Sequence, residues 1–124
     1  MNFYKCNTCK NIIIHVKDEK VPVSCCREVM TKLIPNTTDA ANEKHVPVVT
    51  KNGNNVLVKV GSVEHPMLEV HYIEWIVLET NKGYYIKHLY PNESPNANFN
   101  LEDDEEIIAA YEHCNLHGLW KGQL

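Results

Sequence analysis

The stretch Cys6-Asn7-Thr8-Cys9, followed by the adjacent pair Cys25-Cys26, decides how the start of this chain folds. A two-residue spacer lets both sulfurs of a Cys-x-x-Cys turn reach one ion, and four thiolates complete a tetrahedral site for zinc or iron. Adjacent cysteines fit a zinc ribbon poorly, because its second pair is usually another Cys-x-x-Cys, so we expect distorted geometry here. The alternatives are a redox-active Cys-x-x-Cys or two buried thiols; we predict that all four cysteines hold one metal ion.

Residues 1–36 form a cysteine-rich, basic segment, with six Lys or Arg residues against three acids. A piece of this size cannot bury enough apolar surface to fold alone without a staple, and a structural metal is the obvious one. Within it, residues 12–16 are typical of a short strand, and Asp18-Glu19-Lys20 of the turn after it. We therefore predict a small metal-stapled domain at 1–36.

The polar, turn-rich stretch 35–39 is the best boundary, and residues 37–124 are typical of a β domain. We expect strands over 56–60, 72–80 and 84–90, with a turn at 52–54 and a break between Pro91 and Pro95. Residues 107–113 fit a strand or a helix, and we expect a strand. Short strands at this spacing favour a sandwich or a barrel. The acidic run 102–106 is expected to be a solvated loop or a helix N-terminus.

Composition excludes several classes of protein. The net charge of −4 argues against a nucleic-acid binder held by phosphate contacts. No run approaches the about 18 apolar residues that a membrane span needs. The first residues lack the pattern of an export signal, and five cysteines do not pair evenly, so we expect the reducing cytosol, where clustered cysteines more often hold metal.

A second group of ligand-type residues lies in the β domain. Cys114-Asn115-Leu116-His117 places a thiol and an imidazole within reach of one ion. Four imidazoles and one thiolate exceed what a tetrahedral structural site uses and suit a five-coordinate iron with one open position. Spacing by itself only suggests this set, whose other members are His45, His65 and His71. We expect the remaining histidines to lie at the surface: His15, His88 and His113.

Five motifs together resemble the desulfoferrodoxin family of two-iron superoxide reductases. They are the cysteine quartet, Glu-Lys-His-x-Pro at 43–47, His-Pro-Met at 65–67, His-x-Ile-x-Trp-Ile at 71–76 and Cys-Asn-x-His-Gly-x-Trp at 114–120. The resemblance covers essentially the whole chain. It implies a mostly β protein, with a desulforedoxin-like iron domain at 1–36 and an immunoglobulin-like β-sandwich at 37–124.

The resemblance also implies two iron ions per chain. The first would be held by Cys6, Cys9, Cys25 and Cys26. The second would have Cys114 as its axial ligand and four equatorial imidazoles, from His45, His65, His71 and His117. One departure is visible, because the family often has Gly after the second cysteine and this chain has Lys10. Glycine eases a positive φ, so the geometry of that turn is in question.

The implied reaction is reduction of superoxide to hydrogen peroxide with one electron and two protons. Glu43 would fill the sixth position of the ferric site, and Lys44 would attract the superoxide anion. Trp75 and Trp120 either shield the site or belong to the core. The family further implies a rubredoxin-like electron donor and a homodimer. Two other functions stay open: a non-catalytic iron electron carrier, and a zinc-stapled binding module with incidental histidines.

Overall fold

The computed structural model describes residues 1–124, which divide into two compact units at residues 1–34 and 35–124. Strands dominate both units, and the only helix is the single turn α1 (Asn42–His45). The mostly β architecture expected from the sequence is therefore confirmed. No helix combines the length and the hydropathy that crossing a membrane would require.

The first unit consists of very short strands. β1 (Phe3–Lys5) pairs antiparallel with β2 (Ile12–Ile14) and with β5 (Thr31–Lys32), while β3 (Ser24–Cys25) pairs with β4 (Glu28–Val29). The strand expected at 12–16 is present but ends at Ile14. Only three hydrophobic residues of this unit are buried, Phe3, Cys6 and Met30. So small a core cannot hold these loops by hydrophobic burial alone.

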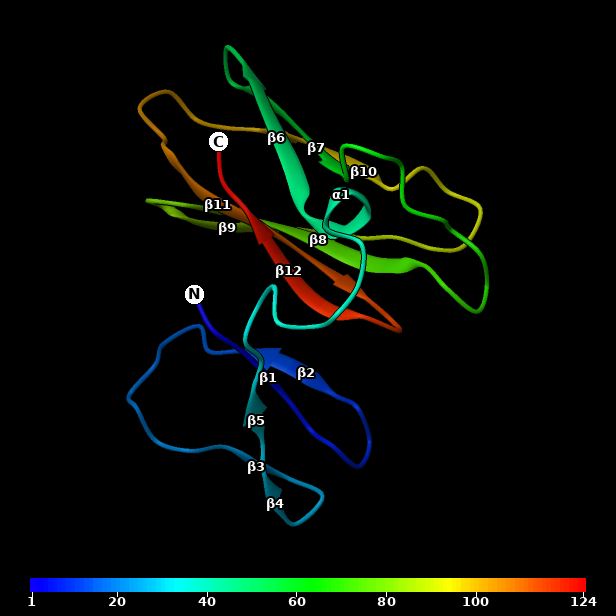
Figure 1. Ribbon diagram of the computed structural model, residues 1–124. Helices are drawn as coiled ribbons and strands as arrows, with labels where there is room; N and C mark the ends of the chain where they lie inside the picture. Colours follow the sequence, from blue (N-terminus) through cyan, green and yellow to red (C-terminus); the bar gives the residue numbers. More distant parts are fainter. The chain divides into compact units, whose positions relative to one another are not determined.

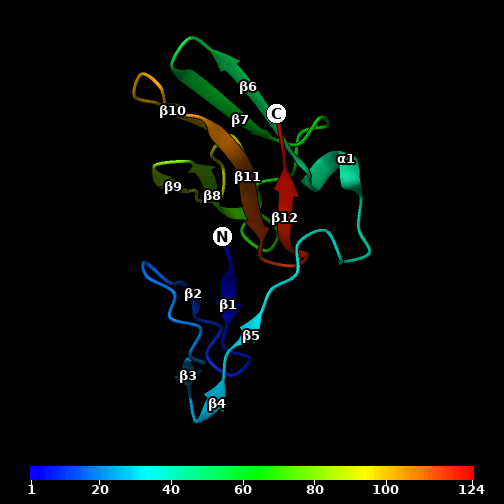
Figure 2. The same cartoon turned by 90° about the vertical axis from the view of Figure 1, so that its left-hand side faces the viewer.

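The second unit is a two-layer antiparallel sandwich, visible in Figures 1 and 2. One sheet has the order β10-β7-β6, and the other has the order β12-β11-β8-β9. Seven antiparallel strands in two packed sheets make an immunoglobulin-like sandwich, as expected. The strands are β6 (Pro47–Asn52), β7 (Asn55–Val60), β8 (Ile73–Thr80), β9 (Gly83–His88), β10 (Asn96–Asn100), β11 (Ile107–Cys114) and β12 (Gly118–Gly122).

Alternation along the strands builds the core between the sheets. Val56, Val58 and Val60 on β7 are at most 1% exposed, and they meet Ile76 and Leu78 of β8 in one apolar cluster. A strand points alternate residues to one face, so this period of two buries the whole valine row. The ambiguous stretch at 107–113 is strand β11, at the centre of its sheet.

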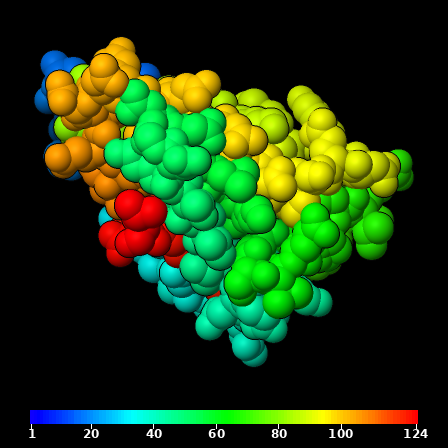
Figure 3. Space-filling view, turned by 90° about the horizontal axis from the view of Figure 1, so that it is seen from above, coloured from blue at the N-terminus to red at the C-terminus, as the bar shows by residue number.

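The acidic run 102–106 caps one end of the sandwich, and most of it is exposed as expected. Glu105 is the correction: it is only 5% exposed, and its carboxylate accepts hydrogen bonds from Thr80 Oγ1 (2.5 Å) and Tyr85 Oη (2.8 Å). Asn54, at the tip of the β6–β7 hairpin, donates to Asp103 Oδ1 (2.6 Å). Figure 3 shows this green tip beside the orange residues of the acidic run.

Candidate metal centres

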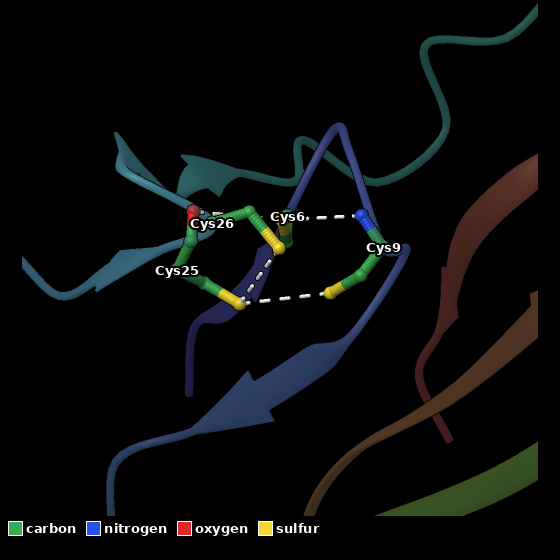
Figure 4. Close-up of side chains that lie close together, drawn as sticks. All are labelled: Cys6, Cys9, Cys25 and Cys26. Atoms are coloured by element: carbon green, nitrogen blue, oxygen red, sulfur yellow. Dashed lines mark hydrogen bonds between the residues drawn. The ribbon is translucent and has the colours of Figure 1, made fainter.

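The four cysteines of the first unit converge on one point. Their sulfur atoms all lie within 4.8 Å of one another, and none is in a disulfide. Cys9 Sγ is 3.6 Å from Cys25 Sγ, which is 4.0 Å from Cys26 Sγ. The four side chains come from two stretches of the chain, the Cys-x-x-Cys turn and the end of β3, and point toward a common centre (Figure 4). Such a group is a tetrahedral site for zinc or iron.

The backbone shows how adjacent cysteines reach one ion. Cys26 and Arg27 both adopt positive φ, at 51° and 64°, so the chain turns sharply between β3 and β4. Lys10, which stands where the family often has glycine, also has a positive φ of 69°. The lysine therefore accepts the left-handed backbone that a glycine would adopt at lower cost. Its Nζ donates to the Asn7 carbonyl (2.6 Å), inside the same turn.

The pKa values of the cysteine thiols indicate that a bound cation would stabilise this group. The backbone N–H of Cys9 donates to Cys6 Sγ (3.4 Å) and lowers the pKa of Cys6 to about 6. The neighbouring sulfurs of Cys9, Cys6 and Cys25 raise the pKa of Cys26 to about 12. Once one thiolate forms, the others resist ionisation because like charges would crowd together. A bound cation removes that conflict, so the donor set fits a metal.

Four imidazoles in the second unit form a closed ring. Centroid distances run 4.7 Å from His45 to His65, 4.6 Å from His65 to His71, 5.1 Å from His71 to His117 and 5.0 Å from His117 back to His45. Each neighbouring pair is edge-on, with planes inclined by 76° to 86°. Nitrogen atoms of His45, His65 and His71 lie within 4.8 Å of one another, and His117 Nδ1 lies 3.1 Å from His45 Nε2, so the four rings could share one metal ion.

Hydrogen bonds select which nitrogen each ring offers. His45 Nδ1 donates to the Ala41 carbonyl (2.7 Å), and His65 Nδ1 donates to the Pro66 carbonyl (2.6 Å). These bonds put the proton on Nδ1 and leave Nε2 as the ligand atom. The Nε2 atoms of His65 and His71 are buried without a hydrogen-bond partner. Buried polar atoms are normally satisfied, and a metal ion coordinated by these two nitrogens would satisfy both.

Burial favours the neutral form of three of the imidazoles, those of His45, His65 and His71. Desolvation lowers the pKa of His65 to about 4, and it also lowers the pKa values of His45 and His71. The neighbouring rings add to these effects because protonated imidazoles would repel one another. A metal ligand must be deprotonated, and this enclosure holds the rings in that form.

Cys114 supplies the fifth donor. Its side chain is fully buried, its sulfur belongs to the same close group as three of the histidines, and it lies 3.9 Å from His117 Nδ1. Burial raises the pKa of the Cys114 thiol, and the backbone N–H groups of Leu116 and His117 oppose that rise. The same two N–H groups would stabilise a metal-bound thiolate. The five residues fit one six-coordinate ion with a single position left over.

Asn115 fixes the ligand loops to each other, a role that sequence reasoning missed. Its backbone N–H donates to the Tyr72 carbonyl (3.1 Å), and its side-chain oxygen accepts from the Tyr72 N–H (3.0 Å). Its side-chain nitrogen donates to the Val70 carbonyl (3.1 Å). The loop that carries His71 is thus clamped to the loop that follows Cys114. The available signal was the asparagine inside the Cys-Asn-x-His motif.

Glu43 and Lys44 are exposed on α1, directly before the ligand His45. The segment 61–63 supports the α1 turn. The Glu43 carbonyl accepts a hydrogen bond from the Val63 N–H (2.8 Å), and a Cβ added to Gly61 would lie only 2.6 Å from that carbonyl oxygen. The charges of both side chains reach the ring. The Lys44 ammonium contributes, after burial and His117, to the lowered pKa of His71, and Glu43 acts in the opposite direction on His45.

The surroundings of the ring correct one expectation. His113 is not a surface residue: it is 3% exposed, its Nδ1 lies 2.7 Å from Glu74 Oε1, and it stacks on Trp75. His88 is exposed, His15 is half-buried against Tyr4, and neither belongs to either group of metal-ligand residues.

The residue directly before His113 on β11, two positions before Cys114, is also unusual. Glu112 is 0% exposed, and both of its carboxylate oxygens lack a hydrogen-bond partner. Desolvation raises the pKa of this carboxyl group well above its usual range. The group therefore lies in the core of the sandwich as a neutral acid, which avoids the large cost of a buried unpaired charge.

Comparison with known proteins agrees with this geometry. Residues 37–123 match the family model described as desulfoferrodoxin. A desulfoferrodoxin of Syntrophotalea carbinolica is 44% identical over 123 residues, covering 99% of this chain and 96% of its own. The crystal structure of the superoxide reductase from Treponema pallidum has a TM-score of 0.82 and 41% identity, covering 98% of each chain. A one-iron superoxide reductase from Giardia intestinalis has a TM-score of 0.56 and 35% identity over 66% of this chain and 97% of its own. This chain belongs to the desulfoferrodoxin family.

Proposed function

We propose that this protein is a superoxide reductase that converts superoxide to hydrogen peroxide with one electron and two protons. The observation that carries the proposal is the closed ring of four imidazoles with the buried thiol of Cys114 beside it. Iron bound there supplies the electron by changing between its ferrous and ferric forms. Five protein donors leave one of six positions open to a small anion.

The protein groups around this position have separate roles. The Cys114 thiolate would donate electron density to an iron bound in this group, and the backbone N–H groups of Leu116 and His117 would limit that donation. Neutral imidazoles leave the positive charge of the ion uncancelled, so an anionic substrate is attracted. Lys44 adds a cation at the edge of the site and binds the developing product by hydrogen bonding. Glu43 closes the open position in the ferric state.

The first unit holds a second iron of rubredoxin type at Cys6, Cys9, Cys25 and Cys26. In this proposal residues 1–36 form the desulforedoxin-like domain and residues 37–124 the superoxide reductase domain. A small rubredoxin-like protein donates electrons, the chain assembles as a homodimer, and the reaction takes place in the cytosol.

The decisive experiment combines metal analysis with a kinetic measurement. The purified protein should contain two irons per chain, and pulse-generated superoxide should oxidise its ferrous histidine site in a fast second-order step with release of hydrogen peroxide. A non-catalytic electron carrier would instead show a closed site that neither reacts with superoxide nor binds azide. A colourless zinc protein would exclude both iron functions.

A further inference from the structure

The surface around the four-cysteine site carries a charge pattern that the superoxide reaction does not use. We propose that Lys10 and Arg27, here called the basic rim, dock a small acidic protein that donates single electrons to this site. The proposal rests on the function proposed above, because it names the entry point of the electron that the reaction consumes.

The first observation is that the sulfur ligands are accessible. Cys6 is 1% exposed and Cys25 is half-buried, whereas Cys9 and Cys26 lie at the surface. A bound iron would therefore have two sulfur atoms that a partner protein can touch. Electron transfer is fastest where the donor approaches a ligand directly, so Cys9 and Cys26 are the natural contact points.

The second observation is that each exposed sulfur is followed at once by a cation. Lys10 follows Cys9 and Arg27 follows Cys26, and both cations are exposed and have positive φ. Both are residues that rarely adopt this backbone, in positions where glycine would be easier. The Lys10 Nζ donates to the Asn7 carbonyl, which keeps the ammonium over the Cys-x-x-Cys turn.

The third observation is how the charge is distributed. Residues 1–34 have six cationic and three acidic residues, whereas residues 35–124 have six cationic and thirteen acidic ones. Two of the three acids in the first unit are already paired, Glu19 with Lys17 (2.8 Å) and Asp18 with Lys20 (3.3 Å). Lys10 and Arg27, the basic rim, take no part in these two ion pairs.

This distribution determines the kind of partner. An acidic protein is repelled by the second unit and attracted to the rim of the first, so its encounter is steered to the exposed sulfurs. One electron leaves the reduced donor and enters the ferric tetrathiolate, which becomes ferrous; no bond is made or broken and no proton moves. The two cations of the basic rim also stabilise the extra negative charge of the reduced centre, so they favour electron transfer to it.

The test uses the full-length iron protein and flavodoxin hydroquinone, a small acidic one-electron donor whose spectrum differs from that of a ferric tetrathiolate. Stopped-flow absorbance would follow reduction of the four-cysteine centre at several salt concentrations. The double variant Lys10→Gln/Arg27→Gln should slow this reduction roughly 10-fold at low salt and flatten its salt dependence. With the methyl viologen radical cation as donor, the same variant should react at least as fast as the unmodified protein.

The matched control is Lys17→Gln/Lys20→Gln, which removes the same charge from the same unit but from side chains that are at least 80% exposed and paired with Glu19 and Asp18. It should retain most of the rate with flavodoxin. A second readout needs no electron transfer: calorimetric binding of oxidised flavodoxin to protein with zinc in the four-cysteine site should weaken in the rim variant and not in the control.

Equal rates and equal affinities in the rim variant and the unmodified protein would overturn the proposal. Equal losses in the rim and control variants would also overturn it, since net charge and not the rim would then act. The reaction with superoxide reports separately on the proposed function. It should be the same in all three proteins, and its complete absence would refute the superoxide reductase while leaving the docking result to stand or fall by itself.

Discussion

Trp120 contacts two ligands of the histidine site at once. Its ring stacks on His45, with centroids 4.8 Å apart and planes inclined by 28°, and its Nε1 donates to the His117 carbonyl (3.1 Å). Trp120 is also 0% exposed, so it belongs to the core as well as to the site. The two expectations for this residue, shielding and core, are therefore one structural role, because the buried ring positions two imidazoles that lie 72 residues apart in the sequence.

Trp120→Phe keeps an aromatic face for His45 but loses the hydrogen bond to His117. We expect the free energy of unfolding to fall by about 2 kcal/mol, because the His117 carbonyl loses its donor and the smaller ring leaves space in the core. The visible band of the ferric histidine site should shift as His117 relaxes. Chemical denaturation and absorbance measure the two effects. Trp75→Phe, which alters a stack on the non-ligand His113, should leave that band in place.

Cys26→Ser should disturb the first metal site alone. The two donor groups share no residue, so the histidine site should keep its iron and its reaction with superoxide while the tetrathiolate band is lost. Metal analysis and visible spectra would show this. Partial zinc at the altered site would be consistent with the prediction, because thiolate sites also accept zinc. An empty histidine site in this variant would show that the two sites are not independent.

Glu43→Ala should open the ferric histidine site to added anions. If the carboxylate closes the sixth position, its removal should allow azide to bind and should change the ferric absorbance. The reaction with superoxide should survive, because it needs that position vacant. Azide titration followed by absorbance is the measurement. A spectrum identical to that of the unmodified protein across the pH range would remove Glu43 from the metal.

Lys44→Ala should slow the second-order reaction with superoxide by roughly 3- to 10-fold at low salt. The net charge of −4 repels an anion, so capture depends on local positive charge, and the field of Lys44 reaches His71. The rate of the unmodified protein should fall as salt rises, and that of the variant should fall less. Lys51→Ala, an exposed lysine on β6, is the matched control and should behave like the unmodified protein. Equal salt slopes for both variants would exclude steering by Lys44.

Removal of iron should make stability depend steeply on acidity. The folded-state pKa of His65 is lowered from 6.5 to about 4, and those of His45 and His71 are lowered too. Between these values the unfolded chain binds protons that the folded chain does not, so stability falls as pH falls through this range and levels off below it. Denaturation of the metal-free protein from pH 7.5 to pH 4 measures the slope. His88→Gln, at an exposed position, should leave it unchanged.

The sequence predicted those elements whose signal is local. The alternating valines of β7 and the apolar run of β8 were visible as strands, and the ligand motifs were visible as spacing. β10 was not predicted, because Asn-Ala-Asn-Phe-Asn has few β-formers and is a strand only through its pairing with β7. α1 also depends on tertiary contacts, because four residues are too few to form a stable helix alone.

The burial of individual polar residues could not be predicted from the sequence, for a different reason. His113 alternates with core positions on a central strand, and only the stack on Trp75 and the contact with Glu74 make its burial favourable. Glu105 lies in an acidic run, and it becomes buried because Thr80 and Tyr85 converge on its carboxylate from another hairpin. Both depend on partners twenty or more residues away along the chain.

Gly61 is not a metal ligand, yet a substitution at this position would alter the site through the backbone of α1. The backbone of α1 rests directly on this residue, where a single added methyl group would have to displace the Glu43 carbonyl and the chain as far as Val46. Glu43 and Lys44 stand on that same backbone, so a change at 61 would move an anion-attracting charge and a closing carboxylate together. Evolution could therefore adjust the rate and the resting state of such an enzyme in one step, from beneath the site, with every ligand retained.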